Sequence, residues 1–444
     1  MAIDNKDKKV LKSSIEREQN EVACSAECEK IKGSKNLNVP HLRFPEFTGE
    51  WKMATFGDIA KGFDYGMNAA AKSFDGNNKY IRITDIDEVS SQYLYDDVVS
   101  PDGELEDRYL VKENDILLAR TGASTGKSYL YRNSDGKLYF AGFLIRANIY
   151  KHNSYFVFSQ LHTLRYKKWI SVMSARSGQP GINSQEYASF PVYTTSLQEE
   201  DKIATFLKLL DERIITQNKI IEDLKKLKSA IIEKVFCPPN QKQPVCRIKG
   251  FEQPLTTYKM NAFCSRIATK NMDAKCSLVL TIAAQYGLVN QGSFFNKSVA
   301  SENLTGYYLL HKGEFAYNRS YSAGYDWRTV KRLDNCDEGV LSTLYICFKI
   351  NETIVDSDFL TYYFESTKWH KGLSDIAGEG ARNHGLLNVS MTDYFNTKHR
   401  FPSMEEQKVI AKMLNAITER EKKAIVLGEC YRKQKQFLLC QMFI

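Results

Sequence analysis

The segment Arg120–Ser128, "RTGASTGKS", brings small, hydroxyl-bearing and basic residues together directly after the apolar run at residues 116–119. It resembles a nucleotide phosphate loop. Such a loop places four residues between its first glycine and the Gly-Lys pair, whereas only three separate Gly122 from Gly126. The residues that follow, "SYLYR", predict a strand and not the helix that a phosphate loop needs. We therefore expect no ATP site in this segment.

The same segment suits contact with a nucleic-acid backbone. Glycines admit close approach, and hydroxyl, arginine and lysine side chains bind phosphate oxygens. The candidate residues are Arg120, Thr121, Gly122, Ser124, Thr125 and Lys127. Arg120 and Lys127 are the foremost of them, while a tight glycine turn without a ligand is the alternative.

A second basic loop precedes the strand end at Phe190-Pro191. Arginine and glutamine can each form two hydrogen bonds with one base edge in the major groove of DNA. The candidates in this loop are Arg176, Ser177, Gly178, Gln179 and Asn183. A counterpart loop at residues 380–385 offers Arg382, Asn383 and His384. Exposed loops that contact no base are the alternative in both places.

A third candidate segment alternates basic and aromatic side chains. It contributes Arg319, Ser320, Tyr321, Arg328 and Lys331. Because duplex DNA hides the faces of its bases, aromatic rings here are more typical of a core than of base stacking. The basic residues are therefore the better candidates.

Residue patterns for catalysis and for metal binding are absent from the sequence. No Asn or Asp is followed by Pro-Pro-aromatic, the pattern typical of amino-methyltransferases. The string Glu200-Asp201-Lys202 resembles part of a nuclease site, but it lies on a helix turn without a partner aspartate. The histidines form no close metal-ligand pair, and the cysteines lack the two-residue spacing of structural zinc sites. We expect neither a catalytic residue nor a metal ion in this chain.

Two long helices are expected to position the candidate loops, at residues 197–237 and 404–444. Apolar residues recur at steps of three and four and give each helix one apolar stripe, as in a coiled coil. Pro238 and Pro239 stop the first helix. The residues assigned to helix pairing are Ile203, Leu207, Leu210, Ile214, Ile221, Leu224, Ile231, Ile410, Leu414, Ile417, Leu427 and Leu438.

Each helix would be about 60 Å long, and neither can bury its stripe alone. We expect the two to pair with each other, antiparallel, and to hold the domains apart; self-association into a homodimer is the alternative. Acidic residues open both helices, at Glu199-Glu200 and Glu405-Glu406. They suit the helix dipole and need no other function.

An internal repeat runs through the chain. Trp51 and Tyr258 are 207 positions apart, and so are Ile203 and Ile410, whereas the offset of Arg120 from its counterpart is 199. The two copies are similar at their ends and differ in their central segments. This is expected when each copy binds a different target on a common frame. Duplication without functional divergence is the alternative.

These features predict an α+β fold with two tandem α/β domains separated by two long antiparallel coiled-coil helices. The domains are expected at residues 39–196 and 238–403, the helices at 197–237 and 404–444, and a charged N-terminal arm at 1–38. A length of 444 residues and 43% hydrophobic residues suit a multidomain globular protein. The net charge of +8 is compatible with a polyanionic partner. No apolar stretch is long enough to span a bilayer, and we expect a cytoplasmic protein.

The order of these segments resembles the specificity subunit of type I restriction and modification enzymes, from about residue 39 to residue 444. The segments that carry the resemblance are "LRFPEFTGEWKMATFGDIA", "ENDILLARTGASTGKSYL", "KGEFAYNRSYS" and the helix starts "LQEEDKIATFL" and "MEEQKVIAKML". The N-terminal arm and the irregular second helix depart from the family pattern.

The resemblance implies two target recognition domains, each binding one half of a split double-stranded DNA site, with the helices setting the spacer. Modification subunits would dock on the helices, bring S-adenosylmethionine and methylate adenine. Restriction subunits would add ATP-driven translocation and cleavage, and magnesium is implied for the partner subunits. This chain itself would bind no cofactor and catalyse nothing. The alternative is a coiled-coil adaptor that binds proteins only, whose affinity for DNA would show no steep salt dependence.

Overall fold

The computed structural model describes residues 38–175, 180–283, 286–295, 303–319, 329–376 and 389–444. The chain divides into two compact units. The first unit is Met1–Thr216 with Leu427–Ile444, and the second is Gln217–Val426. Each long helix therefore begins in one unit and ends in the other. Both units combine antiparallel strands with helices, so the predicted α+β class with two tandem domains is confirmed.

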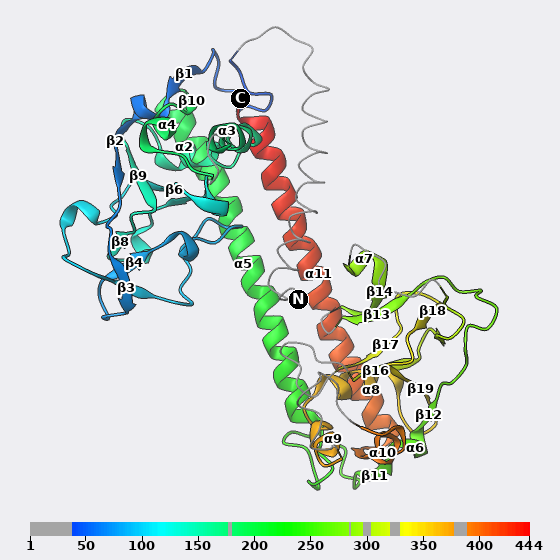
Figure 1. Ribbon diagram of the computed structural model, residues 1–444. Helices are drawn as coiled ribbons and strands as arrows, with labels where there is room; N and C mark the ends of the chain where they lie inside the picture. The colour runs from blue at the N-terminus through cyan, green and yellow to red at the C-terminus, as the bar shows by residue number, and fades with distance from the viewer. Residues whose placement is uncertain (1–37, 176–179, 284–285, 296–302, 320–328, 377–388) are drawn as a thin grey trace. The chain divides into compact units, whose positions relative to one another are not determined.

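The described residues of the first unit form ten strands and the beginning of a long helix (Figure 1). Its strands are β1 (Lys52–Thr55), β2 (Ala60–Tyr65), β3 (Ala70–Ser73), β4 (Lys79–Ile81), β5 (Val99–Asp102), β6 (Asp115–Ala119), β7 (Ser128–Leu130), β8 (Leu138–Phe140), β9 (Leu144–Ile149) and β10 (Pro191–Thr194). Its helices are α2 (Ser154–Gln160), α3 (Leu164–Ser174), α4 (Ser184–Ala188) and the beginning of α5 (Leu197–Val235).

A four-stranded sheet with the order β2-β9-β6-β7 forms the centre of the first unit. Every residue of β6 is buried, because its two faces enter different cores. Ile116 and Leu118 pack among the side chains of α2 and α5. Leu117 and Ala119 pack on the opposite side, against β4 and β8. The apolar run that precedes the glycine-rich segment is therefore a central strand.

The second unit repeats this plan. Its strands are β11 (Thr256–Lys259), β12 (Cys264–Arg266), β13 (Leu280–Ala283), β14 (Gly287–Asn290), β15 (Tyr308–His311), β16 (Phe315–Asn318), β17 (Thr329–Arg332), β18 (Glu338–Leu341), β19 (Ile346–Ile350) and β20 (Lys398–Phe401). Its helices are α6 (Met260–Phe263), α7 (Gln291–Phe295), α8 (Ser357–Glu365), α9 (His370–Ser374), α10 (Met391–Asn396) and the beginning of α11 (Met404–Met442).

The two units share a frame and differ inside it. The central sheet of the second unit has the order β12-β19-β16-β17, and the pair β11-β20 matches the pair β1-β10. Between these elements, β4 pairs with β8 in parallel in the first unit, whereas β15 pairs with β18 antiparallel in the second. The structure therefore places the divergence of the repeat in the strands outside the central sheet.

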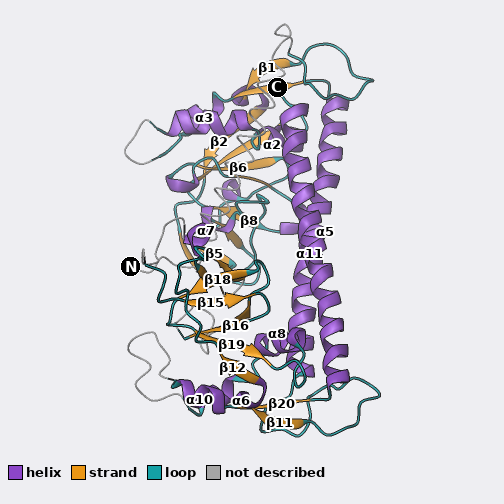
Figure 2. Cartoon of the chain, turned by 90° about the vertical axis from the view of Figure 1, so that its right-hand side faces the viewer, coloured by secondary structure: helices purple, strands orange, loops and turns teal. Residues whose placement is uncertain are grey.

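The long helices pack against each other within each unit (Figure 2). In the first unit, Leu207 and Leu210 of α5 share a core with Leu438 of α11, and Asp211 forms an ion pair with Lys435. The start of one helix therefore meets the end of the other.

The same pairing occurs in the second unit, where the roles of the helices are exchanged. Ile232 of α5 shares a core with Ile410 and Leu414 of α11. Gln217 Nε2 donates to the carbonyl oxygen of Ala424 at 2.9 Å. Both stripes are thus covered by antiparallel pairing inside one chain, as predicted.

One residue assigned to the apolar stripe lies elsewhere. Leu427 is 42% exposed, so its placement in the helix seam is wrong. Ala424 and Gly428 are buried instead, because the four-residue step between them moves Leu427 off the contact face. Ile214, Ile221, Leu224, Ile231 and Ile417 lie on the partly buried flanks of the seam.

An acidic residue at the start of each long helix forms an ion pair with an arginine, in addition to its favourable interaction with the helix dipole. Arg43 Nε donates to Glu199 Oε1 at 2.7 Å, and the Glu199 carboxylate also accepts from Thr195 and Trp51. The second unit repeats the ion pair between Arg247 and Glu406, at 2.8 Å. Each pair joins the segment before the first strand of its unit to a long helix. The expectation that these acids have no further function is therefore corrected.

Candidate nucleic-acid interface

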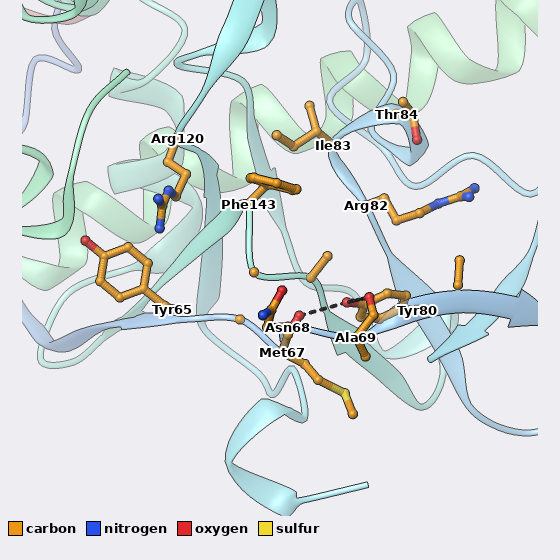
Figure 3. A pocket seen from close by; sticks show the side chains of 14 residues that line it. Tyr65, Met67, Asn68, Ala69, Tyr80, Arg82, Ile83, Thr84, Arg120 and Phe143 are labelled. Atoms are coloured by element: carbon orange, nitrogen blue, oxygen red, sulfur yellow. Dashed lines mark hydrogen bonds between the residues drawn. The ribbon is translucent and has the colours of Figure 1, made fainter. Parts of the chain in front are cut away.

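The first unit has a pocket of about 560 Å³ beside the end of β2. Its lining residues are Tyr65, Gly66, Met67, Asn68, Ala69, Ala71, Tyr80, Arg82, Ile83, Thr84, Arg120, Ala141, Gly142 and Phe143. In Figure 3, Arg120 and Tyr65 lie on one side, Arg82 and Thr84 on the other, and Phe143 between them. The pocket combines apolar walls with two guanidinium groups.

Close backbone packing holds the wall of this pocket in place. Gly142 N donates to the carbonyl oxygen of Met67 at 2.8 Å, and Met67 N donates to that of Phe140, also at 2.8 Å. At Gly66, a Cβ atom would lie 2.2 Å from the carbonyl oxygen of Ala141. Only glycine permits this approach, so the turn between β8 and β9 is fixed against the end of β2.

The two arginines of the pocket differ in their partners. Arg82 is held by Asp85 at 2.7 Å and Asp97 at 2.9 Å, which neutralise its charge. The Arg120 guanidinium lies over the ring of Tyr65, with its carbon 4.8 Å from the ring centroid. Within the part of the chain that the structure describes, no carboxylate forms an ion pair with Arg120. Arg120 is therefore the pocket cation that is available to a ligand.

The tyrosine under Arg120 is fixed as well. Ser184 N donates to Tyr65 Oη at 3.2 Å. Burial alone would raise the pKa of the Tyr65 hydroxyl, but the bond from Ser184 and the positive charge of Arg120 outweigh it, so the pKa is lowered. The stacked pair is thus supported from the N-terminus of α4.

The structure brings the two predicted loops of the first unit together. Ile182 N donates to the carbonyl oxygen of Arg120 at 2.9 Å, and Gly122 N donates to that of Pro180 at 2.9 Å. Thr121 forms an isolated β-bridge with Gly181. Segments that are about sixty positions apart therefore form one surface. Four predicted residues of the second loop, Arg176, Ser177, Gly178 and Gln179, lie outside the described residues.

The remaining candidates of these loops have internal roles. Lys127 Nζ donates to the carbonyl oxygen of Ile86 at 3.2 Å and lies 4.0 Å from Glu88. Thr125 Oγ1 donates to the carbonyl oxygen of Gly122 at 2.7 Å and closes the turn. Asn183 caps α4 by accepting from Glu186 N. Ser124 lies in the turn of residues 122–124, half-buried.

Phe143 is a site residue that the sequence reasoning missed. Its side chain is 62% exposed, although it follows the buried strand β8 and precedes the buried strand β9. Arg120 N donates to its carbonyl oxygen at 3.1 Å. The signal in the sequence was Gly142, which marks a turn between two apolar runs, but only the sheet places this turn beside Arg120.

The corresponding place in the second unit holds Arg319, whose Nε donates to the carbonyl oxygen of Leu344 at 3.1 Å. The predicted candidates Ser320, Tyr321, Arg328, Arg382, Asn383 and His384 lie outside the described residues. Lys331 is largely buried, 3.8 Å from Glu365, and burial lowers the pKa of its ammonium group. Its position on β17 directs it toward α8 and away from an external ligand.

No helix within the described ranges is long and apolar enough to cross a membrane. Among the same residues, no group of three or more His, Cys, Asp or Glu side chains is placed to hold a metal ion. The strand β7, which directly follows Lys127, replaces the helix that a phosphate loop requires. Together, the fold and the candidate surface define an internally duplicated α+β protein with an arginine-aromatic site suited to nucleic acid.

Comparison with known proteins agrees with this class. Residues 48–226 match the family model of the type I restriction modification DNA specificity domain. The MjaVIII specificity subunit of a type I restriction enzyme from Methanocaldococcus jannaschii is 25% identical over 203 residues, which are 44% of this chain and 43% of that protein. The match therefore spans less than half the length of this curated relative.

Solved structures share the fold along most of the chain. The type I restriction-modification S subunit of M. genitalium has a TM-score of 0.55 and 12% identity, covering 91% of this chain and 99% of that one. A chain from a study of assembly and conformational transition of the type I R-M system has a TM-score of 0.50, with the same identity and coverage. Residues 48–226 are therefore similar to a type I restriction modification DNA specificity domain, and the chain has the fold of the type I S subunits.

Proposed function

We propose that this chain is the DNA specificity subunit of a type I restriction-modification complex. Each unit binds one part of a two-part site in duplex DNA. The observation that carries the proposal is the repeated central sheet, β2-β9-β6-β7 and β12-β19-β16-β17, around which the other strands differ. A common frame with two different interiors suits the recognition of two different half-sites.

The chemistry of the candidate surface supports a DNA ligand. Arg120 has no carboxylate partner among the described residues, and the backbone of its loop is held by residues 180–182. A guanidinium group in this state can donate to phosphate oxygens or to base edges. The net charge of +8 adds a modest general attraction to DNA.

In this proposal, the chain catalyses nothing and acts with partner subunits in the cytoplasm. Modification subunits bring S-adenosylmethionine and methylate adenine, and restriction subunits use ATP and magnesium to cleave DNA. The paired helices α5 and α11 offer the partners a long surface. The chain supplies the choice of sequence and directs both activities to it.

A methylation map of host DNA, recorded with and without the gene for this chain, tests the proposal. We expect an adenine-methylated motif of two short parts with an undefined gap, which disappears when the chain is deleted and returns with a plasmid copy. A map that is the same in both strains contradicts the proposal. Purified chain that methylates or cleaves DNA by itself contradicts its non-catalytic role.

A further inference from the structure

We propose that each unit recognises bases with a matched pair of side chains, an arginine and an exposed apolar residue. The pair is Arg120 with Phe143 in the first unit and Arg319 with Leu344 in the second. The inference rests on the proposed function and adds to it the residues that determine which bases are chosen.

In the first unit, the pair lies where β6 ends and β9 begins. Ala119 of β6 is the partner of Leu144 of β9 in the sheet register. Arg120 and Phe143 follow as the next two facing residues, and Arg120 N donates to the carbonyl oxygen of Phe143 at 3.1 Å. Both side chains line the same pocket.

The second unit also places an arginine opposite an exposed apolar residue in the equivalent strands, but here the side chain of the arginine donates the bond and not its backbone. Tyr317 of β16 is the partner of Ile346 of β19. Two positions further along this register, Arg319 faces Leu344, and Arg319 Nε donates to the carbonyl oxygen of Leu344 at 3.1 Å. Leu344 is 54% exposed.

The recurrence gives this observation its weight. A single exposed apolar side chain is ordinary in a soluble protein and needs no explanation. Here a large apolar residue is exposed beside an arginine at the same strand ends of both central sheets, inside a fold whose other connections have diverged. The apolar residue differs between the units, Phe143 against Leu344, as two different half-sites would require.

The chemistry of the pair matches base edges in the major groove. The planar guanidinium donates two parallel hydrogen bonds to O6 and N7 of guanine, and apolar side chains contact the methyl group of thymine. The Tyr65 ring stacks on the Arg120 guanidinium and restricts it before DNA binds. The side chain therefore loses less conformational entropy on binding. A lysine ammonium group lacks the planar, rigid pair of donors that the guanidinium offers.

The state of the neighbouring cations favours base contact over phosphate contact at Arg120. Lys127 is tied to Ile86 and Glu88, and Arg82 is neutralised by two aspartates. Among the described basic residues around this pocket, Arg120 is the cation without a carboxylate partner, and it lies at the end of a central strand beside an exposed ring. A residue that served only to bind phosphate would need neither the stacked tyrosine nor the apolar neighbour.

The test uses the complete complex with its partner subunits and maps the methylated motif for single variants. Arg120→Ala and Phe143→Ala are expected to relax one or two positions in one part of the motif, with roughly 5- to 150-fold loss of discrimination at the arginine contact. Arg319→Ala and Leu344→Ala are expected to relax positions in the other part only. Recognition of the unaffected part shows in each case that the variant has folded.

Two exposed residues of the first unit serve as matched controls. Arg108→Ala removes a positive charge that is paired with Glu106, and Val89→Ala shortens an apolar side chain that is 59% exposed. Both controls should leave the motif unchanged.

Two outcomes separate this inference from the function on which it rests. If the Arg120 variants bind all DNA sequences more weakly, with a shallower salt dependence and an unchanged motif, Arg120 is a phosphate contact and the inference is overturned. If the wild-type complex has no motif that depends on this chain, the proposed function itself has failed. Variants of the first unit that relax both parts of the motif would also overturn the assignment.

Discussion

At the scale of single residues, the most constrained groups are buried charges that join distant parts of a unit. Glu199 is almost fully buried and accepts hydrogen bonds from Arg43, Trp51 and Thr195. Glu406 occupies the equivalent place and pairs with Arg247. A buried carboxylate is stable only when such partners compensate for its lost hydration. The recurrence of this ion pair explains why the acidic helix starts are alike in both copies.

Removing Glu199 should therefore destabilise the first unit strongly. Glu199→Ala leaves the half-buried Arg43 guanidinium without its carboxylate partner, and the expected loss is about 3 kcal/mol in the free energy of unfolding. Denaturant unfolding followed by circular dichroism measures it. Glu405→Ala, at an exposed position of a helix start, is the control and should leave stability nearly unchanged. Equal effects of the two substitutions would contradict the structural role of the buried carboxylate.

A buried histidine gives the second unit a pH dependence. Burial lowers the pKa of His399 to about 3, and the ring is bonded to Tyr363 and Thr397. The unfolded chain protonates this ring below its ordinary pKa of about 6.5, whereas the folded unit does not. Between these two pKa values, stability therefore falls as the pH falls, by about 1.4 kcal/mol per pH unit.

The variant His399→Asn is neutral at every pH and should lack this contribution. From pH 7 to pH 5, the wild type should lose roughly 2 kcal/mol more stability than the variant, as measured by urea unfolding at each pH. At pH 7 and above, the difference between the two proteins should be constant. Parallel stability profiles from pH 7 to pH 5 would show that His399 is protonated in the folded unit.

At the scale of elements, local patterns predicted the long helices better than the loops they position. The three-and-four spacing of apolar residues depends on the helix alone, and α5 and α11 begin at the expected residues, Leu197 and Met404. The sequence pattern placed Leu427 in the apolar stripe of α11, which is wrong. Gly428 is the buried residue there, and a glycine has no apolar side chain that would mark it in the sequence.

The candidate site was predicted only in part for a related reason. The sequence predicted Arg120 and Lys127 as equally good candidates for contact with DNA, since both are basic residues in a glycine-rich segment. Their difference arises from contacts across the fold, to Tyr65 for the arginine and to Ile86 for the lysine. Phe143 became visible as a site residue only when the register of β6 and β9 was known.

The corrected helix seam makes a direct prediction for two leucines of α11. Leu438 is 7% exposed in the core of the first unit, whereas Leu427 is 42% exposed. Leu438→Ala should lower the free energy of unfolding by about 2–5 kcal/mol, because it leaves a cavity. Leu427→Ala should change it by no more than about 0.5 kcal/mol. Thermal unfolding measures the loss of stability in both variants. A larger loss for Leu427→Ala than for Leu438→Ala would show that Leu427 lies in the helix seam, as the sequence pattern predicts.

At the scale of the whole molecule, the chain is a duplicated frame with two different interiors. The repeat was visible in the sequence because Trp51, Ile203 and their counterparts keep one offset. The different strand pairings inside the frame were not predictable, since the offset changes there and the sequence alignment is lost. The parallel pair β4-β8 and the antiparallel pair β15-β18 show how far the interiors have diverged.

The central claim is that each unit specifies one part of a two-part DNA site. The most direct test exchanges residues 250–400 for the same region of a chain with a different motif and maps the methylated sites of the resulting complex. The account predicts that one part of the motif changes to that of the donor while the other part stays the same. A motif that changes in both parts, or in neither, would contradict it.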